Sequence, residues 1–337
     1  MLVGTLGLAG CQPEPPASSN EGASRVASEA GVQYVTTIPP LAMIVAPVVR
    51  TRGSVVSLLQ PGDSPHTYDL RPSDVRRVEQ SAAVFYGAAS LDAWAADLPR
   101  APSVALLGLV PPSARRAFGA AHQAHRALPD ESSPDGSLPD KDAAAAHRHA
   151  PGNTDPHFWT DPQAVRALLP ALADTLCAAD AAGCATYRAN ADSFATALAS
   201  LDAHLDATLR PVRDVPVMLA QPFFRYFLHR YGPELAGVVA PQPAREPSPR
   251  DIHRLAQDAA AHGVRALFVQ QSLPPQAARA VSEAAGIPIH TLDPLGGAAE
   301  RATYDALLKW NAQRIRDALS DAVPSTPTAS SAPPEGA

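Results

Sequence analysis

The stretch VQYVTTIPP, residues 32–40, sets the pattern on which the fold is built. Its β-branched and aromatic residues predict a strand, and the two prolines end that strand. A helix is predicted next, through residue 49, followed by a second strand over residues 54–59. Strand, helix and strand in this order are typical of a parallel α/β layer.

The same alternation continues along both halves of the chain. Further strands are predicted over residues 83–86, 104–107, 215–220, 235–240, 266–270 and 287–292, with helices between them that include residues 73–80 and 91–96. Residues 184–209 are predicted to form a helix with almost no breaker, long enough for a spine between two lobes. We therefore expect an α/β protein with two parallel-sheet lobes joined by a long rigid helix.

Composition allows this fold and excludes some functions. Of the 337 residues, 46% are hydrophobic and 18% are charged, which is enough for two packed domains. The formal net charge of −6, with no long basic block, argues against nucleic acid as a partner. No apolar run reaches the roughly 18 residues that a membrane-spanning helix needs.

Changes in composition along the chain predict its domain boundaries. We expect a signal segment over residues 1–10, a tether over 11–30, an N-terminal lobe over 31–181, a spine helix over 182–210 and a C-terminal lobe over 211–322. A disordered tail rich in Pro, Ser and Thr is predicted over 323–337. The N-terminal lobe is predicted to contain a long insertion at about 109–154.

The three cysteines lead to two separate predictions. Cys11 ends a short apolar segment, Leu-Ala-Gly-Cys, that is similar to a bacterial lipobox, so we expect lipidation at Cys11. The positive region that normally opens a signal segment is absent, so either translation starts upstream of Met1 or the similarity is accidental. Cys177 and Cys184 either form a disulfide across a helix junction or are two buried small side chains.

Two short peptides carry the candidate ligands of the first half. They are PGDSPHTY at residues 61–68 and DPHFWTDP at residues 155–162. In each, a histidine, His66 or His157, directly follows a proline, which stiffens the loop and fixes the direction of the side chain. Gln221 and Asp293 each follow a predicted strand, where ligands bind in open α/β sheets. These four residues are predicted to face one cleft between the lobes.

The predicted insertion contains four more histidines, His122, His125, His147 and His149. They either form a loop that captures metal or are chance histidines in a disordered segment. The sequence leaves both alternatives open.

Five motifs make the chain similar to the solute-binding proteins of zinc and manganese ABC importers, over about residues 32–320. The motifs are LQPGDSPHTY at 59–68, DPHFWTDP at 155–162, FFRYF at 223–227, EPSP at 246–249 and LDPLG at 292–296. The resemblance implies a metal site in the cleft, with His66 and His157 from the first lobe and Asp293 from the second. It also implies that the chain is a monomeric, extracytoplasmic receptor that delivers Zn(II) to an ABC permease.

Gln221 departs from the family pattern, which has His at this position in zinc importers and Glu in manganese importers. An amide oxygen is a weaker zinc ligand than an imidazole. Three readings remain. In the first, Gln221 coordinates the metal weakly through its oxygen. In the second, Gln221 contacts the ligands and not the metal, and water or a loop histidine completes the site. In the third, the site is degenerate.

Three rival functions also remain. The first is a manganese receptor, because the oxygen at Gln221 and the sparse loop histidines suit Mn(II). The second is a metal-buffering or adhesive lipoprotein with no role in transport. The third is a zinc hydrolase, which would need a general base that the sequence does not show. We therefore expect no enzymatic activity.

Overall fold

The computed structural model of the chain describes residues 31–60, 63–65, 68–96, 98, 101–117, 154–241, 246–271 and 276–320. All of them belong to the unit that begins at Gly31. Several predictions fall outside the described residues: the signal segment, Cys11 and its tether, His66, the four histidines of the insertion, and the tail after residue 322. No described helix is both long enough and apolar enough to cross a membrane.

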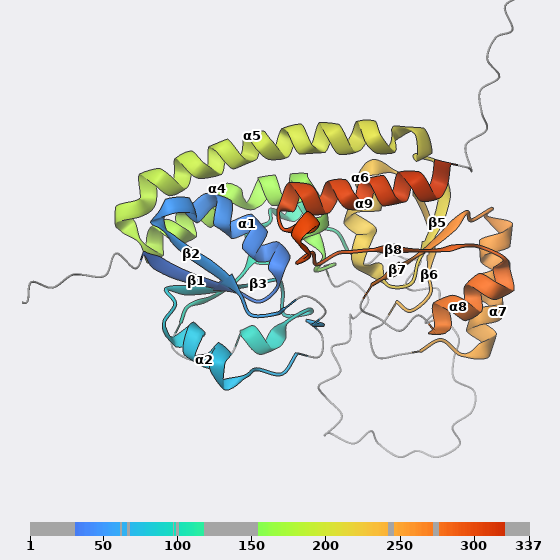
Figure 1. The fold of residues 1–337 in the computed structure, drawn as a ribbon, viewed down its shortest axis with the longest axis horizontal. Coiled ribbons are helices and arrows are strands. Elements are labelled where there is room, and N and C mark those ends of the chain that lie inside the picture. Colours follow the sequence, from blue (N-terminus) through green and yellow to red (C-terminus); the bar gives the residue numbers. More distant parts are fainter. Residues whose placement is uncertain are drawn as a thin grey trace, which may run out of the picture. The chain divides into compact units, whose positions relative to one another are not determined.

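The first lobe is a four-stranded parallel sheet in the order β2-β1-β3-β4 (Figure 1). The strands are β1 (Val32–Thr36), β2 (Gly53–Ser57), β3 (Ala83–Tyr86) and β4 (Ser103–Ala105). Helix α1 (Pro39–Val49) begins at the two prolines predicted to end β1 and buries Leu41, Ile44 and Val45. This burial of apolar side chains between helix and sheet is what stabilises the layer.

Two predicted helices of this lobe differ from the structure. Helix α2 (Pro72–Glu79) begins one residue before the predicted start, at Pro72, and the amide of the preceding Arg71 donates to Asp74 at 2.9 Å. The helix predicted over residues 91–96 is only a short 3₁₀ turn, Ala93–Ala95. The buried carboxylate of Asp92 accepts the amides of Gly87 and Ala88 and so holds this segment as a turn.

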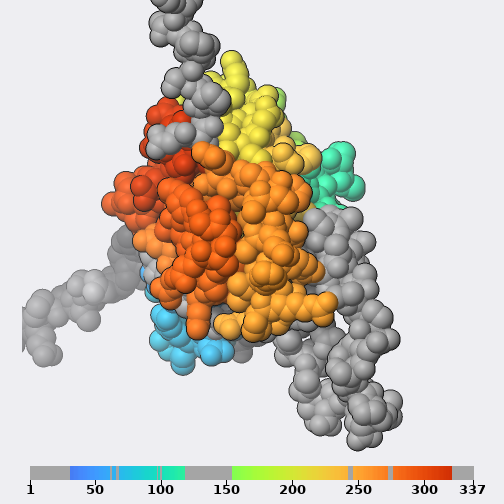
Figure 2. Space-filling model, turned by 90° about the vertical axis from the view of Figure 1, so that its right-hand side faces the viewer, coloured from blue at the N-terminus to red at the C-terminus, as the bar shows by residue number. Residues whose placement is uncertain are grey.

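The second lobe repeats the same strand order, β6-β5-β7-β8, again all parallel. Its strands are β5 (Pro216–Leu219), β6 (Glu234–Val238), β7 (Ala266–Gln270) and β8 (Ile289–Leu292), and its helices are α6 (Arg225–Tyr231), α7 (Pro249–Ala261) and α8 (Gln276–Ala285). Helices α7 and α8 lie side by side at the surface of the molecule that Figure 2 shows. Ser248 caps α7, because its hydroxyl accepts the amide of Asp251 at 3.2 Å.

Helix α5 (Cys184–Leu209) connects the two sheets. Its 26 residues correspond to a length of about 39 Å. In the first lobe it packs against α1 and α4 (Pro162–Ala179). In the second lobe it packs against α6 and α9 (Tyr304–Leu319) (Figure 1). The predicted fold of two parallel-sheet lobes with a long connecting helix is therefore confirmed.

The α4–α5 junction is cross-linked. A disulfide joins Cys177 to Cys184. Between them, Asp180 accepts hydrogen bonds from Arg52, at 2.7 Å, and from the hydroxyl of Tyr187, at 2.8 Å. The Arg52 guanidinium holds the pKa of Asp180 below its usual value, with Tyr187 as the next cause. These contacts fasten the start of α5 to the first sheet.

Hydrogen bonds hold the two ends of the predicted insertion that the structure describes. Ala117 and Thr154 form an antiparallel bridge, and the amide of Asp155 donates to the carbonyl of Arg116 at 2.7 Å. The Arg115 guanidinium donates to the carbonyls of Val110 and Gly108. Residues 109–117, at the start of the predicted insertion, are held by these contacts, and the bounds of the insertion stay a prediction.

Candidate metal centre

His157 lies buried in the turn that opens the DPHFWTDP motif, with 6% of its surface exposed. Its amide nitrogen and its Nδ1 both lie close to Oδ1 of Asp155, at 3.0 and 2.8 Å. A carboxylate at Nδ1 favours the tautomer with the proton there, which leaves the Nε2 lone pair for a metal. This geometry is that of a metal-ligating histidine with its supporting carboxylate.

Sequence reasoning quoted Asp155 within the motif but gave it no role. Asp155 is 1% exposed, and its second oxygen, Oδ2, has no hydrogen-bond partner among the described residues. The available signal was a carboxylate two residues before a predicted ligand histidine. Asp155 is therefore a candidate supporting residue for His157, one that the motif alone does not identify.

Trp159 links the His157 segment to the Asp293 segment. Its ring lies 5.3 Å from the imidazole of His157, between centroids, and its Nε1 donates to the carbonyl of Pro294 at 2.9 Å. The hydroxyl of Tyr304 donates in turn to the carbonyl of Trp159 at 2.7 Å. Two segments 135 residues apart are thus joined directly beside the two candidate ligands.

Asp293 comes directly after β8 and is 7% exposed. Its Oδ1 accepts the amides of Leu295, at 3.0 Å, and Gly296, at 2.8 Å. Its Oδ2 accepts Nε of Arg301 at 2.7 Å. Gly296 has a φ of 71°, a left-handed conformation that glycine adopts without strain. The carboxylate is therefore held in a fixed position by the turn that follows the strand.

The backbone of Asp293 is also fixed, by Asn311 of helix α9. The amide of Asp293 donates to Oδ1 of Asn311 at 2.8 Å, and Nδ2 of Asn311 donates to the carbonyl of Asp293 at 2.7 Å. Asn311 is fully buried. Neither Asn311 nor Arg301 was identified from the sequence, because their roles depend on how α9 packs against β8.

Gln221 follows β5, is half-buried and begins the 3₁₀ turn Pro222–Phe224. Strand β7 lies between β5 and β8, so the strand ends that carry Gln221 and Asp293 are about 10 Å apart. Both residues belong to the carboxyl edge of the same sheet, where side chains can reach a shared ion. The three readings of Gln221 stay predictions.

His66 lies outside the described residues, but its flanking residues are held by the first lobe. Nε1 of Trp94 donates to the carbonyl of Pro65 at 3.3 Å, and the Tyr68 ring lies 5.3 Å from the Trp94 ring. The Tyr68 hydroxyl donates to Asp74 at 2.8 Å; burial, followed by this hydrogen bond, raises the pKa of Tyr68 to about 12. The role of His66 as a ligand stays a prediction.

Within the described part of the chain, no group of three or more His, Cys, Asp or Glu side chains is placed to hold a metal ion. The predicted ligand set also includes His66, which lies outside the described residues, so the complete set of ligands is not tested by this finding. Of the predicted ligands, His157 and Asp293 lie in the described part of the chain, and Gln221 lies at the same sheet edge as Asp293.

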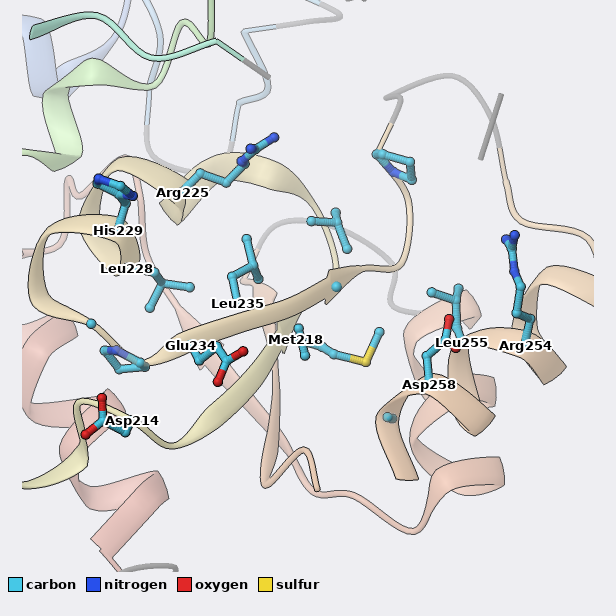
Figure 3. A pocket seen from close by; sticks show the side chains of 17 residues that line it. Asp214, Met218, Arg225, Leu228, His229, Glu234, Leu235, Arg254, Leu255 and Asp258 are labelled. Carbon is cyan, nitrogen blue, oxygen red and sulfur yellow. The ribbon is translucent and has the colours of Figure 1, made fainter. Parts of the chain in front are cut away.

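A large cavity of about 840 Å³ lies elsewhere in the second lobe (Figure 3). It runs along the edge strand β6 and is lined by residues such as Met218, Leu235, Leu228 and Leu255. Of the predicted ligands that the structure describes, none lines this cavity. Although this cavity is large, it is therefore distinct from the candidate site at His157 and Asp293.

Known proteins resemble this chain in sequence and in fold. The family "ZnuA: Zinc-uptake complex component A periplasmic" matches residues 35–318. The High-affinity zinc uptake system protein ZnuA of Brucella suis biovar 1 (strain 1330) is 28% identical over 318 residues, which cover 89% of this chain and 94% of that protein.

Two solved structures share the fold. The crystal structure of ZnuA has a TM-score of 0.66 at 18% identity, covering 85% of this chain and 98% of that one. FpvC from Pseudomonas aeruginosa, in complex with Mn2+, has a TM-score of 0.69 at 21% identity, covering 86% of this chain and 99% of that one. Because the family match extends over most of the sequence, the chain belongs to the family of periplasmic component A of zinc-uptake complexes.

Proposed function

We propose that this protein is an extracytoplasmic receptor that captures Zn(II) and delivers it to an ABC permease. The observation that supports this most directly is the pairing of His157 with Asp155 in a segment bonded to the Asp293 turn through Trp159 and Pro294. A neutral imidazole nitrogen and a carboxylate from two lobes suit a borderline divalent metal.

Zinc is preferred because imidazole is among the usual zinc ligands and because the similar Brucella protein is named for zinc uptake. In this proposal His66 and His157 bind from the first lobe and Asp293 from the second. A metal held in this way favours the closed arrangement of the lobes, and the connecting helix α5 keeps the movement small. The permease then recognises the closed form.

The remaining details of the proposal come from the sequence. The receptor is attached to the membrane by a lipid at Cys11, acts as a monomer and catalyses no reaction. His122, His125, His147 and His149 are proposed to help capture the metal before it reaches the site. A bacterial strain that lacks its own zinc-uptake receptor is given either the parent protein or Cys11→Ser, and its growth on limiting zinc is measured. Growth with the parent tests the transport role, and the difference between the two proteins tests the anchor.

The ligand assignment is tested by zinc titration against a competing chelator. We expect His157→Ala and Asp293→Ala each to weaken zinc binding by at least about 100-fold, because each removes a direct ligand of a site with few ligands. His253→Ala, on the exposed face of α7, is the matched control and keeps the affinity. Unchanged binding in both ligand variants would sink the proposal.

Manganese is the second candidate cargo, favoured by the amide oxygen of Gln221 at the edge of the site and by the likeness to a Mn2+-bound structure. Direct competition separates the two metals. If Mn(II) displaces Zn(II) at equal concentration, the receptor is a manganese receptor. A Gln221→His variant that binds zinc more tightly supports a place for Gln221 beside the metal.

A further inference from the structure

Arg301 stands against the proposed metal ligand Asp293. Its side chain is 9% exposed, and its Nε donates to Oδ2 of Asp293 at 2.7 Å. Its Nη1 donates to Glu300 at 2.7 Å, and its guanidinium carbon lies 4.4 Å from the ring centroid of Trp310. Three contacts thus hold a buried cation beside the carboxylate.

The hydrogen bonds of Asp293 limit how it can bind a metal. Each carboxylate oxygen has room for about two partners. Oδ1 is filled by the amides of Leu295 and Gly296. Oδ2 accepts one hydrogen bond, from Arg301, and has room for one more partner. Asp293 can therefore bind a metal through Oδ2 alone, beside a cation that already partly neutralises it.

The charge of the site follows from the same contacts. The proposed ligands other than Asp293 are neutral when they coordinate, so Asp293 supplies the negative charge and Arg301 cancels it. Glu300 adds a negative charge, but its side chain is 60% exposed and solvent screens it. A divalent ion that binds Asp293 must also approach the guanidinium of Arg301.

We infer that Arg301 sets the metal affinity of the site. It satisfies the buried Asp293 carboxylate when no metal is bound, and it opposes the metal when one binds. This inference rests on the proposed function. With Arg301 present, the metal affinity is lower than the same ligands would give without this cation. A lower affinity suits a receptor that must release its metal to a permease.

The size of the effect follows from Coulomb's law. A double charge about 5 Å from a single charge is repelled enough, even with the screening of bulk water, to weaken binding by about tenfold. Loss of the Arg301 charge is therefore expected to tighten zinc binding by about tenfold or more. The gain is expected to be largest while Asp293 binds the ion, because this ligand draws the ion towards Arg301.

The test is zinc titration of Arg301→Gln against Arg314→Gln. Arg314 is the matched control, because it is an exposed cation 5.1 Å from the same Trp310 ring. We expect Arg301→Gln to bind zinc about tenfold more tightly and Arg314→Gln to bind as the parent does. In an Asp293→Asn background, Arg301→Gln is expected to bring a smaller gain, because the ion is no longer drawn towards Arg301 by the carboxylate.

A second variant and a second readout separate charge from structure. Arg301→Lys keeps the charge, so its affinity stays near that of the parent; if it rises as much as in Arg301→Gln, charge is not the cause. The Tm of the chelated protein is expected to fall in Arg301→Gln, because a buried carboxylate loses its partner. Unchanged or weaker zinc binding by folded Arg301→Gln overturns the inference.

The two levels of the proposal fail in different ways. If Asp293→Ala does not weaken zinc binding, the ligand assignment itself fails. If Asp293→Ala weakens binding and Arg301→Gln does not strengthen it, the ligand assignment stands and the role of Arg301 is rejected.

Discussion

At the scale of single residues, the sequence indicates candidate ligands more readily than the residues that support them. His157 and Asp293 stand out as candidates because a stiff Pro-His loop and a strand end are local patterns. Asp155 lies two residues from His157, but its pairing with Nδ1 depends on how the turn closes. Arg301 reaches Asp293 only because a 3₁₀ turn, Ala299–Arg301, brings it back towards β8. Such contacts depend on tertiary packing, which periodicity does not describe.

The role of Asp155 leads to a prediction at this scale. Asp155→Asn keeps the size of the side chain but removes the charge that holds Nδ1 of His157. We expect zinc affinity to fall by about 10- to 100-fold, as is typical when the partner of a ligand histidine is lost. Competition titration with a zinc chelator measures the change.

Asp161→Asn is the control for Asp155→Asn. Asp161 lies on the same motif and caps α4 by accepting the amide of Gln163 at 2.8 Å, a role that asparagine also fills. Its zinc affinity is expected to stay at the parent level. Equal losses in both variants would mean that the loop as a whole, and not the Asp155–His157 contact, governs binding.

At the scale of elements, prediction succeeded where one local signal dominated. Helix α5 extends from Cys184 to Leu209, as predicted, because its sequence has almost no breaker. The helix expected over residues 91–96 did not form, because the Asp92 carboxylate, held also by the hydroxyl of Thr37, ties the segment to the end of β3. A distant hydrogen bond outweighed a weak helical preference there.

The α4–α5 junction gives a prediction for stability. Replacing Cys177 and Cys184 together by Ser removes a cross-link that closes a short loop. The free energy of unfolding is expected to fall by about 2–3 kcal/mol, since the unfolded chain regains the freedom of that loop. Urea unfolding of the parent and the double variant measures the difference, and reductant is expected to lower the parent to the level of the variant.

At the scale of the whole molecule, the two sheets are joined by more than the connecting helix. Nε1 of Trp159 donates to the carbonyl of Pro294, and the Tyr226 hydroxyl accepts the amide of Arg116 at 2.8 Å, so segments of both halves also meet at these two places. The sequence could predict two lobes and a spine from the order of strands and helices. It could not predict these contacts, because they depend on how the two lobes pack.

Because the proposed ligands come from both lobes, zinc should stabilise the molecule as one unit. At free zinc 100 times Kd, binding adds about 2.7 kcal/mol to the free energy of unfolding. We therefore expect a single calorimetric transition whose Tm rises by about 5 °C or more, and no rise in His157→Ala. If zinc shifts only part of the heat absorption and leaves a second transition in place, one lobe binds the metal alone, and the two-lobe site with Asp293 as a ligand is wrong.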